Sequence, residues 1–417
     1  MNLKMVPTME WQKIKFLLMD KINNNEKEII DLGLHPYADT FIKKNQLKQS
    51  EPVFPLKCYI NYKSGHIHNF VITNDKSRYN EYEYSYTSAN SNYSRKYWEK
   101  YFLNIKKNLL VNKKTKILEI GSNDGYLLKQ FKKVTKNILG IDASKFMTEL
   151  ANKNGIRTKN LIFDLKNSSQ CLLNGKKIDV IIANNVLNHS NDPLNFIKGI
   201  KNIIDNKGTF IFELPYWVHL VKEKKFDQIY HEHVSYFTVK YSKYLLNKAG
   251  FKITNIEETE YHGGSIRIYS SINKNEQENK IVKKYISMEK NLEIFKEKTY
   301  KKFMNDLNKK KFKFLKKIIN YKLKGYKIIG IGAAAKGNTF LNFMGINNQL
   351  MDFVTDASKF KIGKYTPLTR IPIFSDNKIK FIKKNICLIP LAWNLEKFIK
   401  TKLLKFNKNM KMISFYR

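Results

Sequence analysis

The chain has 417 residues, of which 42% are hydrophobic and 13% aromatic, so it can form two or three domains with cores and is neither disordered nor a single small module. Its formal charge of +40 invites a nucleic-acid interpretation, but the basic residues are nearly all scattered lysines, whereas specific recognition favours clustered arginine. We therefore expect no specific nucleic-acid partner and a preference for anionic substrates.

Targeting signals and cysteines indicate the cellular compartment of the protein. No apolar run approaches the roughly 18 to 20 residues of a membrane helix, and the N-terminal stretch lacks the apolar core of a signal peptide. The three cysteines, Cys58, Cys171 and Cys387, lie far apart and form no CxxC pair. We expect a cytoplasmic protein with no membrane partner, no disulfide framework and no cysteine zinc site.

Four segments differ in pattern along the chain. Residues 1–95 are mixed and show no clear period. In residues 96–274, apolar β-rich runs alternate with helical stretches, which is typical of a parallel α/β sheet. Residues 275–320 are rich in lysine and glutamate, with apolar residues at helical spacing, which predicts one or two amphipathic helices. Residues 321–417 return to strand, glycine turn and helix, which predicts a second α/β domain.

A glycine turn follows the first strand of the central segment. In KILEIGSNDGYLL the strand ends at Glu119, and the turn leads into a helix whose first N–H groups can bind a carboxylate or phosphate. The turn resembles that of class I S-adenosylmethionine (SAM) methyltransferases, although glycine turns occur in many α/β proteins. Asp142 ends the next predicted strand, where a carboxylate can accept both ribose hydroxyls. We expect SAM to be bound by Glu119, Gly121, Asn123, Asp124, Gly125, Asp142, Phe163, Asp164, Asn184 and Asn185.

The stretch IYHEHVSYF, residues 229–237, concentrates two histidines, a glutamate and two tyrosines in a chain with eight histidines. Histidine changes its charge near neutral pH, so the cluster fits a site that moves protons. A buried cluster of fully hydrogen-bonded polar groups is the alternative. The residues alone leave both accounts open.

Several stretches together resemble the family of sugar nucleotide C-methyltransferases, which act on 4-keto-deoxysugars attached to a nucleoside diphosphate. They are LEIGSNDGYLL, ANNVLNH, FDQIYHEHVSYF, HGGSIRIY, GAAAKGNTFLNFMGI and DFVTDASKFKIGKY, and they cover most of residues 115–375. The resemblance implies an α/β protein. Its class I SAM-methyltransferase domain, which is Rossmann-like, would span residues 96–274. A small mixed N-terminal domain would precede it, and a helical connector and a second Rossmann-like domain would follow.

The resemblance also implies an active site around the YHEH segment. A carbon beside a ketone attacks only after it loses a proton, so the enzyme needs a general base and donors for the enolate oxygen. We expect His233 to be the base and Glu232 to orient the histidine or the sugar, with Glu232 as the rival base. Tyr230 and His189 are expected to donate to the keto or enolate oxygen.

The resemblance implies that three further motifs hold the substrate. HGGSIRIY is interpreted as a wall of the sugar site, although a Gly-Gly turn that opens a strand with a buried arginine is an equal alternative. In the family the C-terminal domain holds the nucleotide, and a lysine at a glycine-rich helix start suits a diphosphate. In relatives a tyrosine of a YxYxS segment closes over the sugar. In the YxYxS segment the expected residue is Tyr86, with Tyr84 as the second choice. The sugar wall is expected to consist of His262, Gly263, Gly264, Ser265 and Arg267, and the nucleotide site of Lys336, Gly337 and Asn338.

The N-terminal segment departs from the family, whose typical members open with a zinc domain that holds two CxxC pairs. Here the second pair maps onto Asn61 and Ser64, and the first is absent. Asparagine and serine are poor substitutes for thiolate ligands, so we expect no zinc. A makeshift site of Cys58, His66 and His68 is the alternative, and a surface strand is the plainer account.

Three rival functions remain at this point. A sugar O-methyltransferase would use the same scaffold, and a descendant that only binds sugar nucleotides would keep the fold without the chemistry. An RNA methyltransferase would need a continuous basic groove that leads to the SAM site and a salt-sensitive affinity for RNA. The expected substrate is a nucleoside diphosphate 4-keto-deoxysugar.

Overall fold

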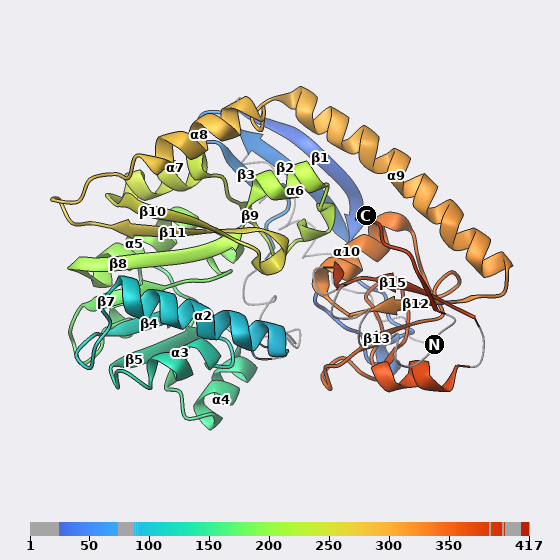
Figure 1. Ribbon diagram of the computed structural model, residues 1–417, viewed down its shortest axis with the longest axis horizontal. Helices are drawn as coiled ribbons and strands as arrows, with labels where there is room; N and C mark the ends of the chain where they lie inside the picture. Colours follow the sequence, from blue (N-terminus) through green and yellow to red (C-terminus); the bar gives the residue numbers. More distant parts are fainter. Residues whose placement is uncertain are drawn as a thin grey trace, which may run out of the picture.

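The computed structural model describes residues 25–73, 87, 89, 91–382, 385–393, 396 and 410–416. These residues form a seven-stranded, a five-stranded and a four-stranded sheet. Figure 1 shows the seven-stranded sheet on the left, the five-stranded sheet on the right and the four-stranded sheet above them. Within the described part of the chain, no helix is long and apolar enough to cross a membrane.

The seven-stranded sheet has the order β10-β11-β8-β7-β4-β5-β6. Its five strands from β8 to β6 are parallel, and β11 runs antiparallel to both of its neighbours. The chain order reverses between β4 and β7, which is where open α/β sheets bind nucleotides. The strands are β4 (Ile117–Ile120), β5 (Ile138–Asp142), β6 (Thr158–Asn160), β7 (Ile178–Ile182), β8 (Ile204–Pro215), β10 (Lys252–Thr259) and β11 (Ser265–Ser271).

Helices cover both faces of this sheet because each buried strand alternates its side chains between two apolar layers. On one face, Ile117 and Ile182 pack with Phe102 and Phe131. On the other, Leu118 belongs to the main core together with residues of α5 and α7. The helices are α2 (Asn92–Asn108), α3 (Tyr126–Phe131), α4 (Lys145–Lys153), α5 (Pro193–Ile203), α6 (Trp217–Glu223) and α7 (Val239–Ala249).

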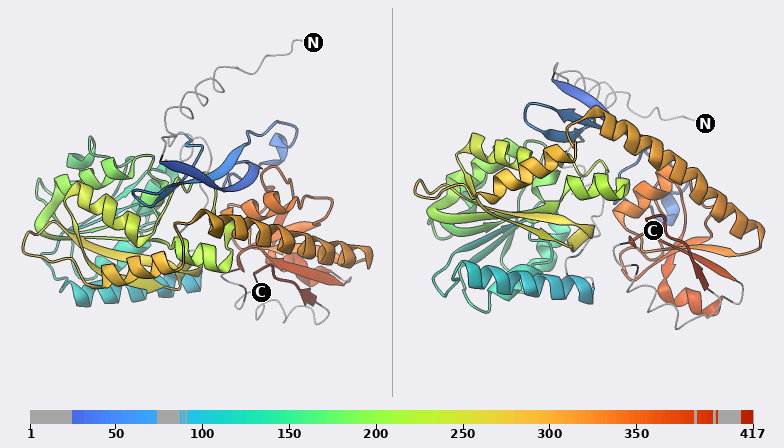
Figure 2. Two further views of the ribbon diagram at one scale, coloured as in Figure 1. Left: turned by 90° about the horizontal axis from the view of Figure 1, so that it is seen from above. Right: turned by 45° about the horizontal axis from the view of Figure 1, so that its top comes forward.

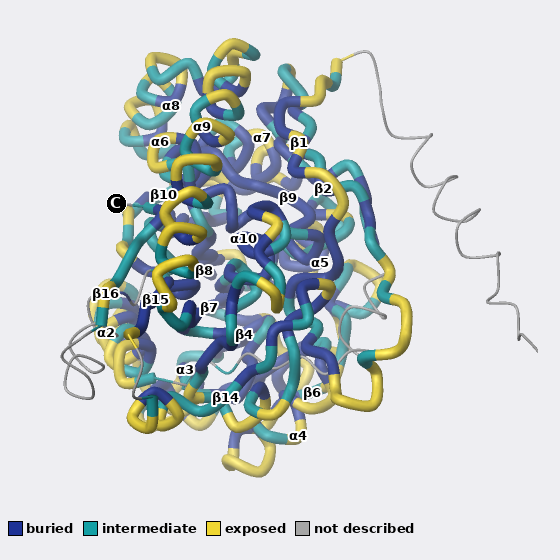
Figure 3. The backbone as a smooth tube through the Cα atoms, turned by 90° about the vertical axis from the view of Figure 1, so that its right-hand side faces the viewer, coloured by how far each residue is buried: buried dark blue, intermediate teal, exposed yellow. Residues whose placement is uncertain are grey.

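The second half of the chain begins with two helices and ends in a parallel sheet. The two helices are α8 (Ile281–Asn291) and α9 (Glu297–Leu323), and α9 runs along the outside of the molecule with one side exposed (Figure 3). The sheet has the order β14-β13-β12-β15-β16, the same pattern as the central sheet. Its elements are β12 (Lys327–Ile331), α10 (Ala335–Met344), β13 (Phe353–Asp356), β14 (Ile373–Ser375), β15 (Ile386–Pro390) and β16 (Met410–Met412).

The two parallel sheets repeat one local structure, built on the sequence DASKF at residues 142–146 and 356–360. The Gly121 N–H donates to Ile141 O at 2.7 Å, and the Gly332 N–H donates to Thr355 O at the same distance. Both glycines have positive φ, +71° and +89°, which side chains rarely adopt. In each sheet the second strand along the chain, β5 or β13, thus holds the glycine turn that follows the first, β4 or β12, and an internal repeat relates the two domains.

The four-stranded antiparallel sheet joins the N-terminal segment to the central domain. Its order is β1 (Glu26–His35), β2 (Phe54–Asn61), β3 (His66–Asn69) and β9 (Ser235–Tyr236), so the strand after the YHEH segment completes it. Figure 2 shows its first strands, in blue, over the junction of the other two sheets. At the degenerate cysteine positions, Asn61 Oδ1 accepts the N–H and the hydroxyl of Ser64 at 3.1 Å each, so hydrogen bonds close the β2–β3 turn.

Candidate active site

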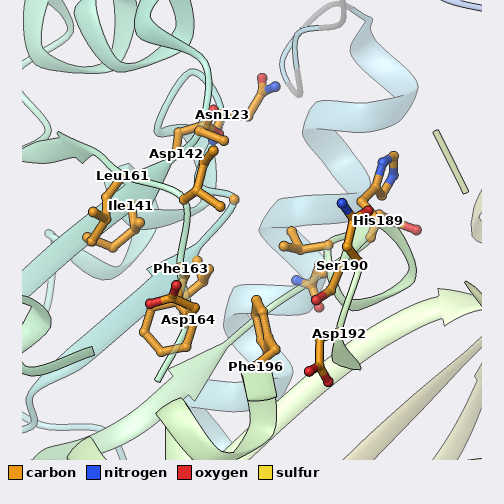
Figure 4. A pocket seen from close by; sticks show the side chains of 18 of the residues that line it. Asn123, Ile141, Asp142, Leu161, Phe163, Asp164, His189, Ser190, Asp192 and Phe196 are labelled. Atoms are coloured by element: carbon orange, nitrogen blue, oxygen red, sulfur yellow. The ribbon is translucent and has the colours of Figure 1, made fainter. Parts of the chain in front are cut away.

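A cavity of about 270 Å³ opens at the carboxyl ends of β4, β5 and β7 (Figure 4). Seven of the ten residues expected to bind SAM line it, namely Gly121, Asn123, Asp142, Phe163, Asp164, Asn184 and Asn185. His189 and His262, expected from the catalytic and sugar-binding sets, line it too. The strand ends therefore bring residues from distant parts of the sequence into one site.

Asp142 is the buried acid of this cavity. Its Oδ2 accepts the Asn123 N–H at 2.9 Å, and its Oδ1 accepts the Ser144 N–H at 2.8 Å. A carboxylate has about four acceptor positions, so two remain for a pair of ribose hydroxyls. Burial raises the pKa of Asp142 to about 6, against the effect of these hydrogen bonds.

The other three expected SAM ligands, Glu119, Asp124 and Gly125, do not line the cavity. Asp124 accepts the Ala89 N–H at 3.0 Å and the Tyr126 N–H at 3.2 Å, so it fixes the start of α3. Burial, and then the charges of Asp124 and Asp142, raise the pKa of Glu119. A Cβ on Gly125 would lie 2.9 Å from Ile156 Cβ, so this glycine allows close packing.

Several residues of the cavity wall were not expected from the sequence. Trp98 comes from α2, far from the glycine turn in sequence. Within the described chain, its indole N–H and the side-chain N–H₂ of Asn184 are buried without a hydrogen-bond partner, so both suit a polar ligand. The other missed wall residues are Ile120, Ile141, Ala143, Leu161, Ile162, Val186, Ser190, Asn191, Asp192, Asn195 and Phe196.

Next to the cavity, Tyr230 and His233 form a hydrogen-bonded pair. Their Oη and Nε2 atoms are 2.6 Å apart, and His233 Nδ1 lies 2.9 Å from Gln228 O. A carbonyl oxygen only accepts, so Nδ1 carries the proton and Nε2 accepts from the tyrosine hydroxyl. The His189 ring lies 4.9 Å from the His233 ring, edge to face, and so connects this pair with the cavity.

His233 is neutral at physiological pH. Burial lowers its pKa to about 3, and the nearby Lys336 ammonium acts in the same direction against the hydrogen bond to Gln228 O. Nε2 therefore keeps its lone pair across the physiological range. A neutral imidazole with a fixed tautomer is the form that can take up a proton.

The N-terminal sheet holds the turn that contains this pair. Asn69 donates from Nδ2 to Tyr230 O at 2.8 Å and to His233 O at 2.9 Å. Its Oδ1 accepts from the Tyr236 hydroxyl at 3.2 Å. Asn69 is buried and fully used, so it fixes both ends of the YHEH turn. Sequence reasoning missed it, because nothing near Asn69 in the sequence points to residue 230.

Glu232 faces a different part of the N-terminal segment. Its Oε1 accepts the backbone N–H of Asp39 at 3.0 Å, and the side chain is buried. Hydrogen bonds to a carboxylate are among the stronger ones in proteins, so this contact sets the direction of the side chain.

The HGG loop lies between the cavity and the C-terminal domain. Gln228 Nε2 donates to His262 O at 3.0 Å, and Lys225 donates to Gly263 O. A Cβ on Gly263 would lie 2.2 Å from the Trp393 ring, so only glycine fits there. Ser265 donates its hydroxyl to Tyr261 O at 2.9 Å. The loop is thus a packed wall, with His262 as its member that lines the cavity.

Arg267 does not line the cavity. Its guanidinium donates to Glu213 at 2.9 Å, to Glu257 at 3.0 Å and to the Tyr97 hydroxyl at 3.0 Å, and it stacks on the Tyr101 ring at 4.0 Å. This placement matches the buried-arginine account rather than a wall of the sugar site. Its connection to the site is indirect, because the Tyr101 hydroxyl donates to Asn184 Oδ1 at 3.2 Å.

The three expected nucleotide ligands of the C-terminal domain have different surroundings. Lys336 lies 4.8 Å from the Trp393 ring, and burial lowers its pKa to about 8, against the charge of Asp227. Gly337 packs against Leu391, where a Cβ would lie 2.8 Å from another Cβ. Asn338 is buried and donates to Ala38 O at 2.6 Å, so its amide is already used within the protein.

Two expectations concern the N-terminal segment. Tyr84 and Tyr86 lie outside the described residues. Among the residues that are described, no group of three or more histidine, cysteine or carboxylate side chains is placed to hold a metal ion. Cys58 contacts Asn69, and His66 Nε2 lies 2.9 Å from the Ser235 hydroxyl, so the members of the makeshift zinc site pack within the sheet.

Two family models match the chain in sequence. Residues 93–256 match the methyltransferase domain, and residues 260–414 match the C-methyltransferase C-terminal domain. A curated relative, C-methyltransferase NovU of Streptomyces niveus, is 26% identical over 279 residues, which are 67% of this chain and 66% of that protein. The aligned part therefore spans just under two thirds of the length of this relative.

Solved structures of methyltransferases are similar to less than half of the chain. A SAM-dependent methyltransferase from Clostridium acetobutylicum is 16% identical, covers 43% of this chain and 92% of its own, and has a TM-score of 0.35. Magnesium protoporphyrin IX methyltransferase of Synechocystis, with bound SAM, is 13% identical, covers 42% and 78%, and has a TM-score of 0.33. In sequence, the chain therefore matches a methyltransferase domain at residues 93–256, followed by the C-terminal domain of C-methyltransferases at residues 260–414.

Proposed function

We propose that the protein transfers the methyl group of SAM to the carbon next to the ketone of a nucleoside diphosphate 4-keto-deoxysugar, by way of an enolate. The observation that carries this proposal is the hydrogen-bonded Tyr230–His233 pair beside the SAM cavity. His189 contacts His233 and lines the cavity, so it connects the pair with bound SAM. An oxygen nucleophile needs little more than placement, whereas a carbon acid needs a base and donors for the enolate oxygen.

His233 serves as the base in this proposal. Its Nε2 lone pair is held in a fixed direction by the Nδ1 contact to Gln228 O. That carbonyl also stabilises the imidazolium formed when Nε2 takes the proton from carbon. The sulfonium of bound SAM supplies the methyl group, and the residues of the cavity hold the two reactants in line.

Tyr230 and His189 serve as donors to the keto oxygen. The Tyr230 hydroxyl lies 2.6 Å from Nε2, so rotation of the O–H bond about Cζ–Oη directs its hydrogen to an oxygen placed beside the histidine. This movement also exposes the lone pair of the base. Glu232, held by the Asp39 N–H, orients the sugar through one of its hydroxyls.

The C-terminal domain holds the nucleotide half of the substrate. Support comes from the internal repeat, because Asp356 copies the surroundings of Asp142: it accepts the Ala333 N–H at 2.7 Å and the Ser358 N–H at 2.7 Å. A carboxylate in this setting suits ribose hydroxyls. Lys336, close to both His233 and His262, supplies positive charge between the sugar site and the diphosphate.

Incubation of the purified protein with SAM and a panel of nucleoside diphosphate 4-keto-6-deoxysugars tests the proposal. Mass spectrometry and NMR should find one new methyl group on the carbon next to the ketone. A methyl group on oxygen would identify a sugar O-methyltransferase instead. SAM binding without transfer to any member of the panel would identify a descendant that only binds.

A further inference from the structure

A corner of the N-terminal segment lies between the catalytic turn and the C-terminal domain. It consists of Ala38 and Asp39, which form a turn after β1. The Asp39 N–H donates to Glu232 Oε1 at 3.0 Å. On the other side, Ala38 O accepts from Asn338 Nδ2 at 2.6 Å. The single peptide group between Ala38 and Asp39 thus joins the catalytic carboxylate to α10.

A second connection runs from the same corner to the C-terminal glycine loop. Lys361 Nζ donates to Ala333 O at 2.7 Å and lies 3.9 Å from Asp39 Oδ1. Ala333 in turn donates its N–H to Asp356, the strand-end acid of the second sheet. Lys361 is buried, so bulk water screens its attraction to the Asp39 carboxylate only weakly.

These contacts matter because Ala38 and Asp39 belong to no helix or strand. Their position depends on tertiary contacts, which are the hydrogen bonds to Asn338 and Glu232 and the ion pair of Asp39 with Lys361. Buried hydrogen bonds of this kind act together, and the loss of one leaves a polar group buried without a partner. A shift of the corner would therefore turn the Glu232 side chain.

We propose that Asn338 and Lys361 are positioning residues, which set Glu232 through the Ala38–Asp39 corner and so connect the C-terminal glycine loop with the reacting sugar. This inference rests on the proposed function, in which that loop holds the nucleotide. Binding energy from the remote nucleotide is then used to align the catalytic carboxylate. Neither positioning residue touches the sugar.

The kinetic test uses Lys361→Met, which keeps the length of the side chain, and Asn338→Leu, which keeps its size. We expect each to lower kcat by about 10- to 100-fold, the range for a misplaced catalytic group, while KM for the sugar nucleotide changes by less than about threefold. The matched control is Lys359→Met, an exposed lysine two residues earlier, which should leave kcat unchanged.

A double-mutant cycle with Glu232→Gln separates positioning from other causes. If Lys361 acts through Glu232, adding Lys361→Met to Glu232→Gln lowers kcat no further. Additive losses would overturn the inference, and so would an equal loss in the Lys359→Met control.

Hydrogen exchange followed by mass spectrometry tests the connection without turnover. In Lys361→Met and Asn338→Leu, amides of residues 36–42 and 229–236 should exchange at least several-fold faster than in the wild type, while β4 and β5 keep their rates. Unchanged exchange at residues 229–236 in both variants would overturn the inference. If the wild type methylates none of the sugar nucleotides, the proposed function fails, and the exchange result still decides on the corner.

Discussion

Asp142 and Asp356 offer a pair of matched substitutions, because each carboxylate accepts two backbone N–H groups at 2.7 to 2.9 Å in the same DASKF sequence. Asp142→Asn and Asp356→Asn remove one acceptor and the charge. In both variants one backbone N–H faces an amide nitrogen, so we expect each to lose roughly 1 to 3 kcal/mol of stability.

The effects on ligands should separate the two sites. A hydrogen bond from a ribose hydroxyl to a carboxylate contributes about 1.5 to 3 kcal/mol, so Asp142→Asn should raise the Kd for SAM by roughly 10- to 150-fold. Asp356→Asn should leave the Kd for SAM within about twofold. It should weaken the binding of dTDP or UDP by a similar factor if the C-terminal loop holds the nucleotide.

Titration calorimetry with SAM, dTDP and UDP measures these constants, and urea unfolding measures the stability of each variant. Because the pKa of Asp142 is raised to about 6, the affinity for SAM should also fall as the pH drops through 6, when the carboxylate gains a proton. An equal rise in the Kd for SAM in both variants would refute the ribose role of Asp142. The weaker binding would then come from the lower stability of both variants.

Three further predictions concern single side chains. Arg267→Met leaves Glu213 buried without its cation and should cost about 3 to 5 kcal/mol in urea unfolding, most of which Glu213→Leu in the same chain restores; no loss would contradict the ion-pair account. Tyr230→Phe should lower kcat by at least roughly 100-fold with an unchanged Kd for SAM, and a wild-type rate would exclude Tyr230 as a donor. The folded pKa of His35 is lowered to about 4 by burial, so the unfolded chain gains a proton first as the pH falls below 6.5. At pH 5 this difference lowers the free energy of unfolding by about 2 kcal/mol. The free energy of unfolding should therefore fall less between pH 7 and pH 5 in His35→Gln than in the wild type, by about the same amount.

The parts of the site that follow the chain locally could be predicted from the sequence. Strand, glycine turn and strand-end acid succeed one another within about 25 residues, and parallel strands bring their carboxyl ends to one edge. Gly121, Asn123 and Asp142 therefore line the cavity as expected. The repeat of DASKF was also visible in the sequence, and it would have indicated the shared geometry of Asp356.

Contacts between distant segments could not be predicted. Asn69 holds residues 230 and 233, and Asp39 holds Glu232, through hydrogen bonds that no local pattern encodes. Trp98 belongs to α2, whose aromatic residues are expected to pack in the hydrophobic core, yet it also lines the cavity. For Arg267 the local sequence was misleading, because its neighbours in sequence resemble a binding motif. In the structure, Arg267 forms ion pairs with Glu213 and Glu257 on the neighbouring strands.

The central claim is that the Tyr230–His233 pair removes a proton from carbon. Deuterium wash-in tests it most directly, with dTDP-4-keto-6-deoxyglucose in D₂O and S-adenosylhomocysteine in place of SAM, so that no methyl transfer competes. We expect NMR to find deuterium at the carbon next to the ketone with the wild type, and none above the buffer rate with His233→Ala. Full exchange with His233→Ala and none with Glu232→Gln would assign the base to Glu232 and contradict the account.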